Sequence, residues 1–284
     1  MTNALQYGTS VFGGMRGYYN KKGKYLSLFR VDDHFKRLLD AVKILGCDFP
    51  YTQKELRQIL LDLVKKNNPD SDIYIRPLAF VGNTSITPSL AGVTLDFAIY
   101  LKPMGDYLPI DRGLTAAVSS WRRVSENSIP PRGKISGAYI NSALARKEAA
   151  DNGYDEAILL NDQGHVCEGS SENIFLVRDG VLITSGNADD ILEGITRRSI
   201  LQLAKDLKIP VEVRSIARTE LYTADEAFFS GTGVQLAWIG QIDKRQVGNG
   251  KRGEITSRLQ DKFFQLIRGL DPKYKNWCTK VAIK

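Results

Sequence analysis

The chain has 284 residues, of which 43% are hydrophobic and 25% charged, the balance of an ordinary globular protein with a sizeable core. No apolar stretch approaches the roughly 18–20 residues of a membrane-spanning helix, so the sequence excludes an integral membrane protein. The formal net charge of +7 suggests nucleic-acid binding, but the basic residues are scattered among acids, which favours a solvated basic surface.

The first third of the chain is expected to form a strand, two helices and two further strands. Apolar residues at helical spacing predict a helix over residues 32–46, closed by a glycine. The capping box Thr52-Gln53-Lys54-Glu55 predicts the start of a second helix, which ends at residues 67–69. Alternating apolar and polar residues then predict strands over residues 72–81 and 93–101.

Residues 102–109 interrupt this pattern with two prolines and a glycine, which makes them the best candidate for a linker. We therefore expect a small α/β domain over residues 1–103, an interdomain loop over residues 104–112 and a large domain over residues 113–284.

Short strands and helices alternate beyond the linker. Asp179-Gly180 is a hairpin signal between two strands. Because many connections resemble hairpins, we expect an α+β fold rather than a doubly wound parallel sheet. The predicted strands span residues 114–121, 156–160, 173–177, 181–184, 211–216 and 226–230, and the predicted helices span residues 137–152, 195–207 and a segment from about residue 253.

Histidine and cysteine usage limits the possible chemistry. His34 and His165 are the only imidazoles, so a histidine-rich metal centre is excluded and we expect no metal. Cys47, Cys167 and Cys278 form no closely spaced pair, which argues against a disulfide framework. With no secretory signal visible, a reducing cytoplasm is the expected location.

Lys134 has the most unusual surroundings of the lysines. Most of the others stand among charged residues, whereas proline, glycine, isoleucine and serine surround Lys134 just before a predicted helix. Partial desolvation lowers the pKa of a lysine and frees its lone pair for imine chemistry. The alternative interpretation is an ordinary lysine in an exposed loop.

Three further segments suggest a phosphate or cofactor site. Gly194-Ile195-Thr196 opens a predicted helix, and Ser230-Gly231-Thr232-Gly233 follows a predicted strand. Backbone N–H groups at helix starts and glycine turns bind phosphates, although a Gly-Ile-Thr start is more often an ordinary helix cap. The segment from Glu168 to Asn173 carries two carboxylates in a short polar run, which could also be a solvated loop.

The order of these segments along the chain resembles that of the class IV pyridoxal-phosphate aminotransferases, most closely the branched-chain amino acid aminotransferases. The resemblance extends from Tyr7 to about Lys262. Its segments are Tyr7-Gly8-Thr9-Ser10-Val11-Phe12, residues 34–38, Tyr74-Ile75-Arg76-Pro77, the Lys134 loop, residues 168–175, Gly194-Ile195-Thr196-Arg197 and Ser230-Gly231-Thr232. It implies the two-domain fold of that class, similar to D-amino acid aminotransferase, with the cofactor in the large domain.

The resemblance implies a role for each matching cofactor residue. Lys134 is expected to be the Schiff-base lysine, and Glu168 the carboxylate that keeps the pyridine nitrogen protonated. Tyr139 matches the tyrosine near the phenolic oxygen of the cofactor, and Asn173 supports Glu168. The expected phosphate ligands are Arg37, Ile195, Thr196 and Thr232.

The substrate residues are also implied by the resemblance. Thr232 and Gly233 are expected to bind the α-carboxylate through a turn, and Tyr74 and Arg76 share one face of a strand and help to anchor carboxylates. The remaining candidates are Phe12, Arg16, Tyr107, Tyr139 and Tyr7, the last from a neighbouring subunit; without the resemblance, core packing explains the aromatic residues equally well.

The reaction implied is a ping-pong transamination that moves the amino group of leucine, isoleucine or valine to 2-oxoglutarate, with Lys134 as the proton shuttle. The resemblance further implies branched-chain amino acid biosynthesis in the cytoplasm by a homodimer or a larger homo-oligomer. Small-molecule amino acids and 2-oxo acids are the expected partners, with neither nucleic acid nor membrane.

Three features depart from the family pattern, and the first two affect the expected substrate range. Gly13 stands where these enzymes usually carry a glutamate, so a pairing with Arg16 is lost. Met104 replaces a common tryptophan, which softens one pocket wall. The strand pair that usually precedes the Tyr7 segment is also missing, so the start of the chain is either genuine or truncated.

Related activities remain alternatives. D-amino acid aminotransferases, (R)-selective amine transaminases and aminodeoxychorismate lyases share the lysine and phosphate segments, but the segments at Tyr7 and Tyr74 favour the branched-chain group. A basic nucleic-acid-binding protein is the alternative of a different class; it predicts salt-sensitive retention on DNA or RNA and no cofactor.

Overall fold

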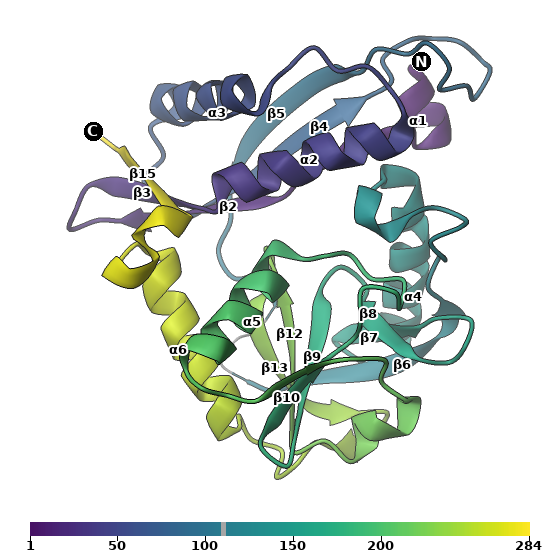
Figure 1. Cartoon of the computed structure of the whole chain (residues 1–284), viewed down its shortest axis with the longest axis vertical. Coiled ribbons are helices and arrows are strands. Elements are labelled where there is room, and N and C mark those ends of the chain that lie inside the picture. Colours follow the sequence, from purple (N-terminus) through teal and green to yellow (C-terminus); the bar gives the residue numbers. More distant parts are fainter. Residues whose placement is uncertain (109–111) are drawn as a thin grey trace. The chain divides into compact units, whose positions relative to one another are not determined.

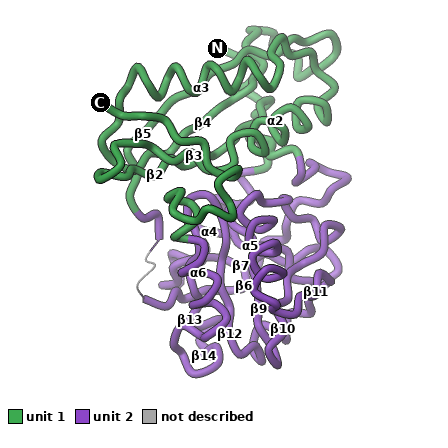
Figure 2. The backbone as a smooth tube through the Cα atoms, turned by 60° about the vertical axis from the view of Figure 1, so that its left-hand side comes forward, with its two compact units in different colours: residues 1–105, 133–138, 264–284 green, residues 106–132, 139–263 purple. Residues whose placement is uncertain are grey.

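The structure is a computed structural model that describes residues 1–108 and 112–284, which form two compact units (Figure 2). Unit 1 comprises Met1–Gly105, Gly133–Ala138 and Phe264–Lys284, and unit 2 comprises Asp106–Arg132 and Tyr139–Phe263. Residues 109–111 of the expected interdomain loop 104–112 lie outside the described residues.

The units depart from the expected domain division at two places. Residues 133–138 and 264–284, expected in the large domain, belong to unit 1. One cause is strand β15 (Cys278–Ala282), which pairs antiparallel with β3 (Tyr25–Phe29). The other is an antiparallel bridge between Ile135 and Val11. Such pairings join residues far apart in the sequence, so local patterns do not reveal them.

Unit 1 contains a six-stranded antiparallel sheet in the order β1-β4-β2-β3-β15, with β5 beside β4. Its other strands are β1 (Ser10–Phe12), β2 (Met15–Asn20), β4 (Ile73–Phe80) and β5 (Asp96–Pro103). The hairpin between β2 and β3 contains the lysine-rich turn at residues 21–24.

Unit 1 also contains the helices α1 (Asn3–Tyr7), α2 (Val31–Leu45) and α3 (Gln53–Asn67). The predicted capping box of α3 is present: Thr52 N donates to Glu55 Oε2 at 2.7 Å, and Glu55 N donates to Thr52 Oγ1 at 3.3 Å. Phe35 of α2 and Leu56 of α3 are fully buried in the same core as Leu28 of the sheet, so the apolar stripes of both helices cover the sheet.

Unit 2 contains a nine-stranded mixed sheet in the order β11-β10-β9-β12-β13-β6-β7-β8, with β14 beside β13. Figure 1 labels β6 to β10, β12 and β13 of this sheet. Its parallel pairs are β10 with β11, β13 with β6, and β6 with β7, and its other pairs are antiparallel. The strands are β6 (Leu114–Arg122), β7 (Glu156–Leu160), β8 (Val166–Gly169), β9 (Asn173–Arg178), β10 (Val181–Thr184), β11 (Val211–Val213), β12 (Glu226–Gly231), β13 (Gln235–Ile242) and β14 (Arg245–Gln246).

The long helices of the second half are α4 (Tyr139–Asp151), α5 (Ile195–Asp206) and α6 (Glu254–Ile267). Ala145 and Ala149 of α4 pack against Ala157 and Leu159 of β7, which face away from the main core of the sheet. Short 3-10 helices are η1 (Pro131–Gly133), η2 (Ser136–Ala138), η3 (Arg218–Tyr222) and η4 (Pro272–Trp277). The described residues contain no helix long and apolar enough to cross a membrane.

The predicted hairpin at Asp179-Gly180 joins β9 and β10. Both residues have positive φ, 50° and 77°, and Arg178 pairs with Val181 across the turn. This is the geometry that the dipeptide favours because glycine and aspartate tolerate left-handed conformations. The hairpin connections and the mixed sheet confirm an α+β fold.

Candidate active site

A buried ion pair lies at one end of the sheet of unit 2. Glu168, near the end of β8, accepts from Nη2 of Arg123 at 2.8 Å, and the two side chains are 6% and 5% exposed. Arg123 directly follows β6, and its backbone N donates to the carbonyl of Leu160 on β7, which fixes its direction. A guanidinium at this distance stabilises the anionic carboxylate.

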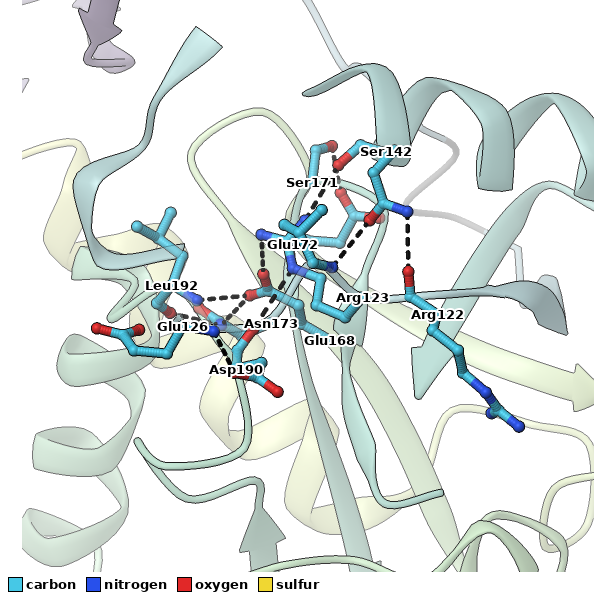
Figure 3. Close-up of polar contacts among 12 residues, drawn as sticks. Arg122, Arg123, Glu126, Ser142, Glu168, Ser171, Glu172, Asn173, Asp190 and Leu192 are labelled. Atoms are coloured by element: carbon cyan, nitrogen blue, oxygen red, sulfur yellow. Dashed lines mark hydrogen bonds and ion pairs between the residues drawn. The ribbon is translucent and has the colours of Figure 1, made fainter. Parts of the chain in front are cut away.

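Two further donors fix the orientation of Glu168 (Figure 3). Its Oε2 accepts from Asn173 Nδ2 at 2.9 Å and from the backbone N of Leu192 at 3.1 Å. Asn173 Nδ2 also donates to the carbonyl of Leu192 at 2.8 Å. The result is a rigid, negatively charged acceptor, suited to a cationic N–H donor.

The sequence does not single out Arg123, because Arg122 and Arg123 are two of the scattered basic residues that favour a solvated surface. Arg122 is indeed exposed, whereas Arg123 is 6% exposed. The pairing of β6 with β7 shifts register between Val118 and Arg122, so simple alternation fails there. At this irregular strand end the alternation of buried and exposed residues does not show which of the two arginines is buried.

The N-terminus of α5 forms a second potential anion site. Its N-cap, Gly194, supplies no side-chain cap bond, and Ile195 and Thr196 are buried in the first turn. A Cβ on Gly194 would lie 2.1 Å from Asn173 Oδ1, so the close approach of these two segments requires glycine. Helix starts of this kind bind phosphate through backbone N–H groups.

The turn between β12 and β13 contains Thr232 and Gly233. A Cβ on Gly233 would lie 3.5 Å from Tyr107 Cδ1, so the tyrosine ring is in contact with this turn. The hydroxyl of Tyr107 accepts from Nη1 of Arg146, whose guanidinium lies 4.9 Å from the centre of the same ring. Tyr139 is half-buried at the first position of α4.

Lys134 of unit 1 has a constrained backbone. Its φ is 44°, in the left-handed region that non-glycine residues rarely adopt. Its carbonyl accepts from Phe12 N at 3.3 Å, and its Nζ lies 4.9 Å from the centre of the Phe12 ring. Strand β1 therefore holds the lysine backbone in place.

Other predicted substrate residues gather around Phe12 in unit 1. The Arg76 guanidinium lies 4.5 Å from the centre of the Phe12 ring, and Arg76 Nη2 donates to the Tyr74 hydroxyl at 2.9 Å. The structure thus brings Phe12, Tyr74, Arg76 and Lys134 into one group, with the guanidinium of Arg76 and the amine of Lys134 placed against the same aromatic ring.

Three remaining candidates of unit 1 have different surroundings. Arg16 is 2% exposed, and its Nη2 donates to the carbonyls of Met104 and Gly105, both at 2.8 Å. The hydroxyl of Tyr7 donates to the carbonyl of Ile86, and the residue is 40% exposed. Arg37 is half-buried on α2. For Arg16 the described contacts support the backbone of residues 104–105.

The departure at Gly13 has a local structural basis. Gly13 N donates to the carbonyl of Pro77 at 2.8 Å. A Cβ at this position would lie 2.8 Å from Pro77 Cγ, so a glutamate requires the proline to shift. Arg16 instead finds its acceptors in the backbone of residues 104–105.

Residues 10–242 match the family model described as amino-transferase class IV. The chain belongs to this family. It is 46% identical to a protein named probable branched-chain-amino-acid aminotransferase from Aquifex aeolicus, over 100% of this chain and 92% of that protein. The resemblance identified from the sequence is therefore confirmed.

Two crystal structures have the same fold as this aminotransferase. The branched-chain aminotransferase of Thermoproteus uzoniensis with norvaline has a TM-score of 0.95 and 44% identity, covering 99% of this chain and 92% of that one. The branched-chain amino acid aminotransferase of Thermobaculum terrenum in its PLP form has a TM-score of 0.93 and 40% identity, covering 98% and 91%. The class IV aminotransferase fold is confirmed.

The polar groups of this aminotransferase fit pyridoxal 5′-phosphate, the cofactor of its class. Unit 2 offers Glu168, a buried anionic acceptor for the ring nitrogen, and the start of α5, which has donors for a phosphate. Unit 1 offers the Lys134 amine on a backbone that β1 fixes. Within the described residues, no cluster of three or more His, Cys, Asp or Glu side chains is placed to hold a metal ion.

Proposed function

We propose that this aminotransferase moves the amino group of leucine, isoleucine or valine to 2-oxoglutarate in ping-pong order. The observation that carries this proposal is the buried pair of Glu168 and Arg123, which supplies a permanent anion for a protonated pyridine nitrogen. Pyridoxal phosphate, when bound, supplies an aldehyde that condenses with amines and a ring that accepts electrons from the substrate Cα.

The cofactor-holding residues divide by charge. Glu168, oriented by Asn173, accepts from the ring nitrogen. Ile195 and Thr196 at the start of α5 donate to the phosphate because the first N–H groups of a helix lack intrahelical acceptors. Arg37 and Thr232 complete the phosphate ligands, and Tyr139 donates to the phenolic oxygen.

Lys134 is the catalytic residue. Its Nζ takes the proton from the substrate Cα and returns it to the cofactor carbon, which requires a neutral amine near neutral pH. The Phe12 ring beside Nζ excludes water from one side of the amine, and the left-handed backbone sets the direction of the side chain.

The substrate residues separate into carboxylate ligands and apolar walls. Thr232 and Gly233 bind the α-carboxylate with backbone N–H groups, and Arg76 with Tyr74 binds the second carboxylate of glutamate or 2-oxoglutarate. The apolar walls come from Phe12, Tyr107, Tyr139 and Tyr7 of a neighbouring subunit, with Arg16 supporting residues 104–105. Norvaline, which accompanies the Thermoproteus uzoniensis enzyme in its crystal structure, has an apolar side chain that fits such a pocket.

The proposal includes a cytoplasmic homodimer or larger homo-oligomer that takes part in branched-chain amino acid biosynthesis. Ile140 and Leu144, one turn apart on α4, are 67% and 36% exposed and offer apolar surface to a second subunit.

The decisive experiment follows cofactor and substrate together. The purified protein should be yellow, and borohydride should fix the cofactor on Lys134, detected as a mass increase on the peptide that contains this residue. Lys134→Ala should abolish the fixation and lower turnover at least about 10³-fold. Lys22→Ala, at an exposed turn lysine, is the matched control and should change neither.

Substrate choice is tested by comparing L-leucine, D-alanine and (R)-1-phenylethylamine as donors with 2-oxoglutarate as acceptor. Preference for L-leucine supports the proposal. Preference for D-alanine or the amine assigns the chain to another activity of the same fold. Tight, salt-sensitive retention on DNA without any cofactor contradicts the enzymatic proposal altogether.

A further inference from the structure

Two buried carboxyl groups of unit 2 have no part in the proposed chemistry. Glu156 begins β7 and is 0% exposed, and Glu172 lies between β8 and β9 and is 4% exposed. Burying two carboxylates side by side is very unfavourable unless a proton or a counter-ion separates them. Such a pair therefore needs a structural reason.

The hydrogen bonds of the pair are incomplete in a specific way. Glu156 Oε1 accepts from Ala157 N at 2.8 Å, and Glu172 Oε2 accepts from Ser171 Oγ at 2.7 Å. The second oxygen of each group, Oε2 of Glu156 and Oε1 of Glu172, is buried without a donor among the described residues. A proton between these two oxygens satisfies both at once.

The electrostatics place that proton on Glu172. Burial raises the pKa of Glu172 well above its usual value, and the charge of Glu156 and a hydrogen bond to it raise the pKa further. Ser171 and Arg146 act in the opposite direction but more weakly. Phe229 and Gly231, which approach from β12, carry no charge.

The remaining negative charge faces Arg146 on α4. Arg146 Nη1 lies 3.8 Å from Glu156 Oε2 and donates to the hydroxyl of Tyr107. The Tyr107 ring contacts Gly233, and a Cβ on Gly231 would lie 3.2 Å from Glu172 Cβ. The carboxyl pair is thus connected to both sides of the turn at residues 231–233.

We propose that Glu172 and Glu156 share one proton, carry a single negative charge, and through Arg146 and Tyr107 position the turn that binds the substrate carboxylate. The role of the turn rests on the proposed function, whereas the shared proton does not. Glu172 and Glu156 are positioning residues. Loss of the proton adds a second buried charge beside Arg146, which weakens carboxylate binding at alkaline pH.

The first test is direct and needs no activity. Infrared spectra of the intact holoenzyme at neutral pH should contain the carbonyl stretch of a protonated carboxylic acid, separate from the carboxylate bands. Glu172→Gln should remove this band, and Glu254→Gln, at an exposed position of α6, should leave it. A spectrum of the wild-type protein without the band overturns the proposal.

The second test separates charge from shape. Glu172→Gln keeps a donor toward Glu156 and the single charge, so KM for the 2-oxo acid should stay within about twofold at neutral pH and lose its alkaline rise. The double variant Glu156→Gln, Glu172→Gln has no charge to balance Arg146 and should raise KM about tenfold with a smaller change in kcat.

The outcomes distinguish the two proposals. A single variant as impaired as the double variant, or one that keeps the wild-type alkaline rise in KM, contradicts the shared proton. A holoenzyme that has the infrared band but transfers no amino group contradicts the proposed function and the role of the turn, while the shared proton stands.

Discussion

The guanidinium of Arg123 lies 2.8 Å from the carboxylate of Glu168, and neither side chain has more than 6% of its surface exposed. The order of the sheet explains this contact. Only β7 separates β6 from β8, so the long side chain of Arg123, which follows β6, can reach Glu168 on β8. A buried charge that loses its partner is strongly destabilising. The pair therefore links the stability of unit 2 to the group that we propose for the pyridine nitrogen.

Arg123→Met should destabilise the protein by about 3–5 kcal/mol, because it leaves Glu168 buried without its counter-ion. Cofactor affinity should fall as well. Without its counter-ion the buried Glu168 favours the neutral form, and a neutral carboxyl no longer stabilises a protonated pyridine nitrogen. Denaturant unfolding and titration with pyridoxal phosphate measure the two effects. Arg122→Met, at the exposed neighbour, should stay within about 0.5 kcal/mol of wild type. Equal effects of both changes would argue against the importance of the ion pair.

Gly194→Ala should weaken cofactor binding at least about tenfold without unfolding the protein. The new methyl group would lie 2.1 Å from Asn173 Oδ1, so Asn173 must move and releases Glu168. Gly105→Ala is the control, because a Cβ there meets no atom within 4 Å. Equilibrium binding of pyridoxal phosphate gives the comparison, and unchanged affinity in Gly194→Ala would show that the close contact is dispensable.

Gly8→Ala should cost more stability than Gly46→Ala, although both glycines have a φ of 67°. Placing an alanine at this left-handed φ costs about 1–2 kcal/mol of stability at either position. Only at Gly8 would the methyl group also collide, 2.6 Å from Gly137 Cα. Because residues 134–137 run beside β1, Gly8→Ala should also reduce kcat by displacing Lys134. Thermal unfolding and steady-state kinetics of both variants test this; similar losses would locate the cost in φ alone.

Tyr107→Phe should raise KM for both substrates several-fold and leave kcat nearly unchanged. The substitution removes the acceptor of Arg146 but keeps the ring against Gly233, so the turn loses orientation rather than packing. Tyr222→Phe removes a hydroxyl that donates to Asp243 in another part of unit 2 and should leave KM unaltered. A fall in kcat alone would point to a role for Tyr107 in proton transfer instead.

The stability of the protein should decline with rising pH partly because of Glu172. Its pKa is raised in the folded state by burial and by Glu156, so the folded state binds more protons than the unfolded state above the ordinary glutamate pKa. Its contribution is fully present below about pH 4 and is lost as the pH rises toward the folded-state pKa, by at most about 1.4 kcal/mol per pH unit. Glu172→Gln should remove this slope in denaturant unfolding measured at several pH values, with Glu254→Gln as the unchanged reference.

The elements predicted well are those whose signals are local. The capping box at Thr52, the hairpin at Asp179 and strands β7 and β10 are all predicted by residues that are close together in the sequence. By contrast, β15 belongs to unit 1 only through its pairing with β3, and no local pattern announces such a partner.

The candidate site shows the same division. The sequence order suggests Lys134 and Glu168, but the surroundings that determine their chemistry come from distant segments. Arg123 follows β6 and reaches Glu168 on β8, and Glu156 of β7 meets Glu172, which lies between β8 and β9. Burial of a charged residue depends on these contacts, which hydrophobic periodicity does not encode.

The composition of unit 1 has a consequence for biogenesis. Residues 278–282 provide the edge strand of its sheet and leave the ribosome only after every residue of unit 2 has been made. Unit 2 is therefore free to fold during synthesis. Until β15 is made, the β3 edge of the sheet of unit 1 has no partner strand. Nascent chains stalled before residue 278 should accordingly be sensitive to proteases in their first hundred residues and need chaperone protection there.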